Sequence, residues 1–150
     1  MTHRPFLILF IDDDQALPLV VTQAARSTFP EAQFTFVSNA QQAQEWLLSG
    51  PRRLPQLVLM DVDLNDTIDG LQLLAQIRSD ERLSLLQILM ISANDQLPLV
   101  YQAYQTGASS FIHKPFSLDE WKQFMAGLRQ YWYETVTLPP LTGVRPANKG

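Results

Sequence analysis

Residues 57–63, Leu-Val-Leu-Met-Asp-Val-Asp, join an apolar run to two carboxylates that stand one residue apart. The apolar residues do not alternate with polar ones, which is typical of a strand buried on both faces of a sheet. The next stretch, 65–70, has the composition of a loop. Because ligands bind beyond the carboxyl ends of the strands in open parallel sheets, Asp61 lies where chemistry is expected. Taken alone, Asp61 could equally open a solvated loop.

Three other apolar runs also end in polar residues, which favours the functional interpretation of Asp61. We expect each run to be a strand, and Gln33–Val37 to be a further, shorter one. The runs and the polar residues that follow them are Phe6–Ile11 with Asp12, Asp13 and Asp14, Gln87–Ile91 with Ser92, and Ser110–His113 with Lys114.

Helical periodicity fills the segments between these strands. Asp69 or Gly70 begins one helix, and Ser117 with Glu120 three residues later forms a capping box that opens the last one. We expect five helices, at about 17–28, 40–48, 69–78, 96–106 and 117–136.

The alternation of five strands with five helices predicts an α/β fold, a doubly wound five-stranded parallel sheet with helices on both faces. The polar residues at four strand ends then meet at one edge of the sheet. We expect residues 1–136 to form this domain, with an extended last helix, and residues 137–150 to form a flexible Pro-rich tail.

Composition excludes several classes of function. The chain of 150 residues has a net charge of −4, so it lacks the basic surface that nucleic-acid binding needs. It has no Cys, which excludes disulfides and thiolate chemistry, and any bound metal would be a hard cation held by oxygen. The apolar run Phe6–Ile11 is too short to span a membrane. We therefore expect a soluble cytoplasmic protein.

The residue types at the strand ends suggest phosphoryl chemistry. The carboxylates of Asp12, Asp13 and Asp61 would repel one another, so a divalent cation, most naturally Mg²⁺, is the expected occupant. The ammonium of Lys114 and the hydroxyl of Ser92 can hold phosphoryl oxygens. A carboxylate among these groups can act as a nucleophile and form an acyl phosphate. The simpler alternative is that the early acids, Asp14 above all, only begin a helix.

The chain resembles the response regulator receiver domain, the CheY-like family of two-component signalling, whose fold is flavodoxin-like. The resemblance runs from about Phe6 to Trp132. Its motifs are specific in combination, and the matching stretches are Ile8–Asp13, Leu57–Asp61, Ile88–Ala93 and Gly107–Phe116.

The resemblance implies a role for each site residue. Asp61 would be the phosphoacceptor, and Mg²⁺ would be bound by Asp13, Asp61 and the backbone carbonyl of Asp63, with Asp12 acting largely through water. The phosphoryl group would be held by Ser92 and Lys114, with Ala93 small enough to admit it. Phe111 would be the aromatic switch residue that responds to activation together with Ser92, and the Lys114–Pro115 bond would be cis.

Two positions depart from the family pattern. Where members often have Pro, four residues after the phosphoacceptor, this chain has Asn65, and the stretch from Asp61 to Gly70 is one residue longer than usual. Asp63 adds an acid that could strengthen metal binding or repel the phosphoryl group. These differences leave the shape of the loop, and partner recognition there, open.

Three alternative functions are consistent with parts of this sequence. Asp61 and Asp63 also resemble the nucleophile motif of haloacid-dehalogenase-like phosphatases, but the acid pair Asp12-Asp13 comes early and Asn65 replaces the usual Thr. A non-phosphorylated pseudo-receiver scaffold would not need the full set of site residues. A receiver from a DNA-binding regulator would need an output domain after Val136. We therefore expect no enzyme beyond self-phosphorylation and self-dephosphorylation, and output by protein contact.

The expected partners are a histidine kinase or phosphotransfer protein and a downstream protein, with no nucleic acid or membrane. The aromatic sequence Tyr131–Pro139 resembles the extension of single-domain regulators that serve bacterial phytochromes. Phe124, Tyr131 and Tyr133 fall outside the apolar stripe of the last helix, so a monomer would expose them. This predicts a homodimer through that helix, unless the tail from Leu138 to Val144 covers the rings.

Overall fold

The structure, a computed structural model, describes residues 4–48 and 53–141. Within these residues, five strands pair in parallel in the order β2-β1-β3-β4-β5. The chain order reverses on the two sides of β1, so the topological switch point lies between β1 and β3. The predicted doubly wound sheet is confirmed. The strands are β1 (Phe6–Ile11), β2 (Ala32–Val37), β3 (Leu57–Asp61), β4 (Ile88–Ser92) and β5 (Ser110–His113).

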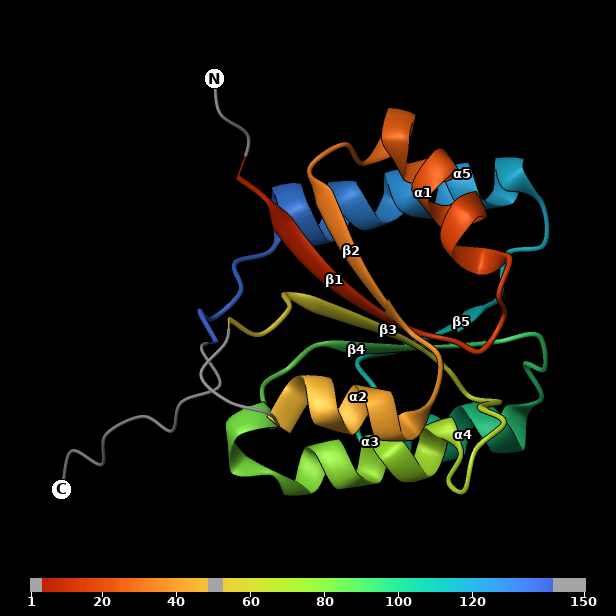
Figure 1. Ribbon diagram of the computed structural model, residues 1–150, viewed down its shortest axis with the longest axis vertical. Coiled ribbons are helices and arrows are strands. Elements are labelled where there is room, and N and C mark those ends of the chain that lie inside the picture. The colour runs from red at the N-terminus through yellow and green to blue at the C-terminus, as the bar shows by residue number, and fades with distance from the viewer. Residues whose placement is uncertain (1–3, 49–52, 142–150) are drawn as a thin grey trace, which may run out of the picture.

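Helices cover both faces of the sheet. Figure 1 shows α1 and α5 on one face and α2, α3 and α4 on the other. A short 3₁₀ turn, Glu81–Leu83, follows α3, and a π-helical segment, Arg129–Thr135, continues α5. The helices are α1 (Leu17–Thr28), α2 (Ala40–Leu48), α3 (Gly70–Ser79), α4 (Leu97–Thr106) and α5 (Leu118–Leu128).

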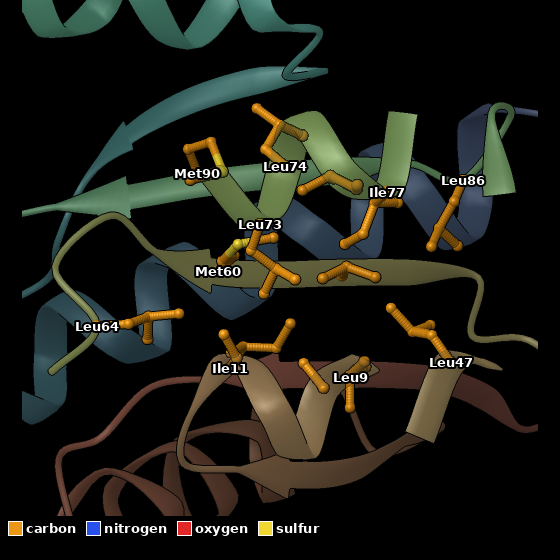
Figure 2. Packing of buried hydrophobic residues seen from close by; sticks show 14 of the residues in the cluster. Leu9, Ile11, Leu47, Met60, Leu64, Leu73, Leu74, Ile77, Leu86 and Met90 are labelled. Atoms are coloured by element: carbon orange, nitrogen blue, oxygen red, sulfur yellow. The ribbon is translucent and has the colours of Figure 1, made fainter. Parts of the chain in front are cut away.

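The side chains of each central strand alternate between two apolar cores. On β1, Leu9 and Ile11 pack into the core under α2 and α3 (Figure 2), whereas Ile8 and Phe10 pack under α1 and α5. Because both faces are buried, the strands read as unbroken apolar runs instead of alternating patterns. This burial holds the strand ends rigidly at the edge where the polar residues follow.

The predicted helix boundaries follow local chemistry. Asp69 and Gln72 form a reciprocal capping box at the start of α3, and Ser117 and Glu120 form another at the start of α5. Gly107 ends α4 in the left-handed conformation, with φ of 114°. These signals are local in the sequence, so they could be predicted before the fold was known.

The C-terminal aromatic residues differ in exposure. Tyr131 is 53% exposed, but Tyr133 packs against Phe6 and Phe29 with ring centroids 6.0 and 5.8 Å away. Phe124 is half-buried against Trp121. The expectation that a monomer exposes all three rings is therefore correct for Tyr131 alone. The π-helical hydrogen bonds of Arg129–Thr135 change the angular spacing of side chains and turn Tyr133 back toward the core.

The chain after the π-helical segment returns beneath the amino ends of the strands. Leu138 packs against the core on the α1 and α5 side, and Leu141 packs against the core on the opposite side. The N–H of Leu54 donates to the carbonyl of Leu141 at 3.3 Å. A flexible tail over residues 137–150 stays a prediction, and its part beyond Leu141 lies outside the described residues. Among the described helices, none combines the length and apolar character that crossing a bilayer requires.

Candidate functional site

Three carboxylates meet at the switch point of the sheet. Asp12 and Asp13 directly follow β1, and Asp61 is the last residue of β3, the strand that pairs with β1. Each contributes an oxygen, and these oxygens all lie within 4.8 Å of one another. The predicted gathering of these acids is therefore confirmed, and it follows from parallel strands that end at the same edge.

Asp61 is held on both of its carboxylate oxygens. Its Oδ1 accepts a hydrogen bond from the backbone N–H of Asp63 at 2.8 Å, and its Oδ2 accepts one from the Nζ of Lys114 at 3.1 Å. The residue is only 6% exposed, and this burial raises the pKa of Asp61 to about 6. The negative charge of Asp12 acts in the same direction, while the hydrogen bonds from Asp63 and Lys114 oppose it.

Lys114 joins β5 to the two carboxylates. Its Nζ donates to Asp12 Oδ2 at 2.8 Å as well as to Asp61. Burial opposes the charged form, but the hydrogen bonds to both acids outweigh it and raise the pKa of Lys114 above its ordinary value. The side chain is therefore an ammonium at neutral pH, and it offsets part of the negative charge of the site.

The Lys114–Pro115 peptide bond is trans, so the prediction of a cis bond is wrong. The trans isomer is favoured before Pro in the absence of other forces. In this arrangement the backbone N–H of Lys114 donates to the carbonyl of Ser92 at 2.9 Å, and its Nζ already reaches both acids. The site therefore assembles its ammonium without a cis bond.

Ser92 lies on β4, the strand next to β3, and Phe111 lies on β5, the strand beyond it. Ser92 is fully buried at the end of β4, where its Oγ accepts the N–H of Asn94 at 3.0 Å. Phe111, on β5, is half-buried against the core under α2 and α3, and its N–H donates to the hydroxyl of Tyr104 at 3.2 Å. The sequence singled out Phe111 but not its contact with Tyr104, because no local pattern links α4 to β5.

Two backbone features near Asp61 were not foreseen. The amide of Asp63, and not its exposed side chain, holds the Asp61 carboxylate. A Cβ atom at Gly70 would lie 2.2 Å from the carbonyl oxygen of Asp61, so the start of α3 approaches the site more closely than any other residue type allows. In the sequence, this close approach is indicated only by a glycine at the start of a helix that follows an acidic strand end.

The donor set fits a hard divalent cation. Carboxylate oxygens are the ligands that such cations prefer, and Asp13, which is half-buried, leaves one side of the group open to solvent. Three carboxylates and one ammonium leave an excess of negative charge that a cation would neutralise. The residues present therefore match a metal centre.

The metal-free protein is expected to lose stability as the pH rises through about 6, because of Asp61. A raised pKa means that the folded state binds this proton more tightly than the unfolded state. The resulting contribution to the free energy of unfolding is complete below the pKa of the unfolded state, and it is lost as the pH rises through the pKa of the folded state. Asp61→Asn should therefore be more stable than the natural chain at pH 8, by up to about 3 kcal/mol, with little difference at pH 4.

Urea unfolding with a chelator, at both pH values, measures this difference. Equal differences at pH 4 and pH 8 would show that the ionisation of Asp61 is not its cause.

Comparison with known proteins identifies the family. The pattern of the response regulator receiver domain matches residues 8–126. A probable methanogenesis regulatory protein, FilR2 of Methanothrix harundinacea, is 26% identical over 131 residues, which are 85% of this chain and 84% of that protein. Response regulator Rcp1 of Synechocystis sp. is 23% identical over 144 residues, which are 92% of this chain and 96% of Rcp1.

Solved structures share the fold. The phosphorylated cyanobacterial phytochrome response regulator RcpA superimposes with a TM-score of 0.80 at 23% identity, covering 90% of this chain and 99% of that one. The Mn²⁺-bound form of Rcp1 gives a TM-score of 0.77 at 23% identity, with the same coverage. This chain belongs to the response regulator receiver domain family of two-component signalling. The family assignment supports the receiver function over the phosphatase and scaffold alternatives.

Proposed function

We propose that this protein is a phosphorylation-dependent switch that accepts a phosphoryl group on Asp61 from a histidine kinase or a phosphotransfer protein. The observation that carries the proposal is the position of the buried Asp61 carboxylate, 3.1 Å from the Lys114 ammonium and grouped with two further acids. The protein acts in the cytoplasm, where such donors are phosphorylated, and signals by contact with a downstream protein. Its only catalysis is its own phosphorylation and dephosphorylation.

The proposed chemical step transfers a phosphoryl group between two nucleophiles. A carboxylate oxygen of Asp61 attacks phosphorus, the new P–O bond forms, and the P–N bond of the donor phosphohistidine breaks. The donor imidazole leaves with the electron pair of that bond and takes up a proton. Lys114, which already donates to Asp61, is proposed to hold one phosphoryl oxygen, and the Ser92 hydroxyl is proposed to hold another.

Mg²⁺ is the proposed metal. Asp13, Asp61 and the backbone carbonyl of Asp63 would hold it, and Asp12 would act largely through water. When bound, the ion supplies positive charge that offsets the charge of the phosphoryl oxygens. Asp12 meanwhile keeps the Lys114 ammonium oriented through their 2.8 Å hydrogen bond.

Ser92 and Phe111 are proposed to carry the response from the site to the surface of α4 and β5. Ser92 ends the strand next to Asp61, and Phe111 lies on the strand beyond it. A phosphoryl group that accepts a hydrogen bond from the Ser92 hydroxyl would favour one of two pre-existing conformations around Phe111. The hydrogen bond from the Phe111 amide to the Tyr104 hydroxyl links β5 to α4, which supports including α4 in the proposed response.

The proposal is tested by phosphotransfer from a panel of histidine kinases, read by intact mass. At least one kinase should add a single phosphoryl group in the presence of Mg²⁺. Bacterial phytochrome kinases belong in the panel, because Rcp1 and RcpA are among the structures that share this fold and the aromatic extension is present. Turnover of a generic phosphomonoester, without a phosphorylated protein, would favour a phosphatase instead.

We also propose a homodimer through α5 and its extension. Tyr131 is 53% exposed and stacks edge-on against Trp132, at a groove that Ile112 and Leu128 also line. Exposed aromatic groups beside a groove that is lined in part by apolar residues are typical of a contact surface. Identical surfaces pair most simply about a twofold axis.

Sedimentation of the natural chain should show a dimer at micromolar concentration, and Tyr131→Glu should be monomeric. Tyr101→Glu is the matched control, because Tyr101 is also exposed, at 65%, but lies on α4. A natural chain that remains monomeric at high micromolar concentration, phosphorylated or not, would contradict the dimer.

A further inference from the structure

The loop between β3 and α3 is tied at both ends to the site. The N–H of Gly70 donates to the carbonyl of Val62 at 2.9 Å, which brings the two ends of the loop together. The same loop carries Asp63, whose amide donates to Asp61 at 2.8 Å. Any shift of this loop therefore moves a hydrogen-bond donor of the Asp61 carboxylate.

The middle of the loop reaches a different helix. Asp66 Oδ2 accepts the backbone N–H groups of Ala40 and Gln41 at 3.1 and 3.4 Å, and its Oδ1 accepts that of Thr67 at 2.7 Å. Ala40 and Gln41 are the first residues of α2, whose opening N–H groups have no partner within the helix. A carboxylate is favoured there by the helix dipole.

Asp66 is not the local N-cap of α2, the one supplied by the residue directly before the helix. That role belongs to Asn39, whose Oδ1 accepts the N–H of Gln42 at 2.8 Å. The hydrogen bond from Thr67 lowers the pKa of Asp66, so the side chain is ionised at neutral pH. Leu64 is buried in the core nearby (Figure 2), and its carbonyl accepts the N–H of Asp66 at 2.9 Å, so it anchors the same part of the loop to the core.

We propose that Asp66 is a positioning residue, which fixes the loop on the start of α2 and thereby holds the Asp63 backbone against Asp61. The expectation that Asp66 affects metal affinity rests on the proposed function, because the Asp63 carbonyl is a proposed metal ligand. The expectation that Asp66 protects the hydrogen bond from the Asp63 amide to Asp61 does not depend on a metal.

The test compares Asp66→Ala with Asn39→Ala, since each substitution removes one side-chain cap from the same end of α2. Three quantities are measured: the thermal midpoint, the exchange rate of the Asp63 amide in metal-free protein, and the dissociation constant for Mg²⁺ by calorimetry. Both variants should lower the thermal midpoint to a similar extent. Only Asp66→Ala should speed the exchange of the Asp63 amide and weaken Mg²⁺ binding, by about tenfold.

Asp66→Asn provides the rescue. Its amide oxygen can still accept from the start of α2, so its amide exchange and Mg²⁺ affinity should lie closer to the natural chain than those of Asp66→Ala. If Asp66→Ala matches Asn39→Ala in both Asp63 amide exchange and Mg²⁺ affinity, Asp66 is a helix cap only and the proposal is overturned. If the natural chain binds no Mg²⁺, the metal assignment fails, while faster Asp63 exchange in Asp66→Ala alone would still support the positioning role.

Discussion

An Asp61→Asn protein is expected to gain no phosphoryl group when it is incubated with Mg²⁺ and a small phosphodonor, whereas the natural chain gains one. The amide oxygen of Asn has no negative charge and is a poor nucleophile, so the acyl phosphate cannot form. Asn has nearly the shape of Asp, and its single amide oxygen can keep one of the two hydrogen bonds that the Asp61 carboxylate accepts, either from the Asp63 N–H or from the Lys114 ammonium. A loss of phosphorylation would therefore reflect chemistry and not misfolding.

Intact mass measures this result, and Asp63→Asn is the matched control. The Asp63 carboxylate is exposed and holds none of the contacts seen at Asp61, so its removal should leave one phosphoryl group per chain. An unchanged yield in Asp61→Asn would move the acceptor to another residue, with Asp12 and Asp13 the next candidates. The two variants together separate a particular nucleophile from a general requirement for acidic residues in this region.

The carboxylate group of Asp12, Asp13 and Asp61 is expected to couple Mg²⁺ binding to the stability of the fold. Mg²⁺ is expected to raise the free energy of unfolding of the natural chain, by about 2.7 kcal/mol at a concentration one hundred times its dissociation constant. Asp13→Ala should abolish this increase, because the half-buried Asp13 supplies one of three clustered oxygens and is the one most open to solvent. Removing a carboxylate also relieves repulsion, so the metal-free variant should not be less stable for electrostatic reasons.

Asp14→Ala is the control for the metal experiment. Asp14 is adjacent in the sequence, but its Oδ1 accepts the N–H of Ala16 at 3.0 Å, at the start of α1, and it is not in the carboxylate group. Its removal should lower stability with and without Mg²⁺ while the increase caused by Mg²⁺ remains. Urea unfolding at several Mg²⁺ concentrations separates the two contributions. Equal losses of the Mg²⁺ effect in both variants would mean that the acids serve mainly to begin the helix.

Local sequence predicted the frame of the site well. The unbroken apolar run before Asp61 marked a strand buried on both faces. Asp69 or Gly70 and the capping box at Ser117 marked helix starts that the structure confirms. Once the strands are known to be parallel, their carboxyl ends must share one edge, which brings Asp12 and Lys114 together across 102 residues of sequence. This part of the site follows from topology and needs no knowledge of side-chain contacts.

The contacts that orient the side chains were less predictable. The trans Lys114–Pro115 bond, the link from Asp66 to the start of α2 and the return of Tyr133 to the core were all absent from the sequence-based expectations. Each depends on where a side chain or backbone turn lies relative to an element distant in sequence. A composition of Asn and Asp in 65–69 indicates a loop but does not say which helix that loop will meet.

The sequence by itself determined the order of the strands and helices, the acids and the ammonium at the strand ends, and the family that they define. It could do so because hydrophobic periodicity and helix capping act over a few residues, and strand direction then places the ends. Only the tertiary structure decided how Asp61 is held, by the Asp63 amide on one oxygen and Lys114 on the other, and how burial raises its pKa. Those properties arise from distances and solvent exclusion, which exist only after the elements have packed.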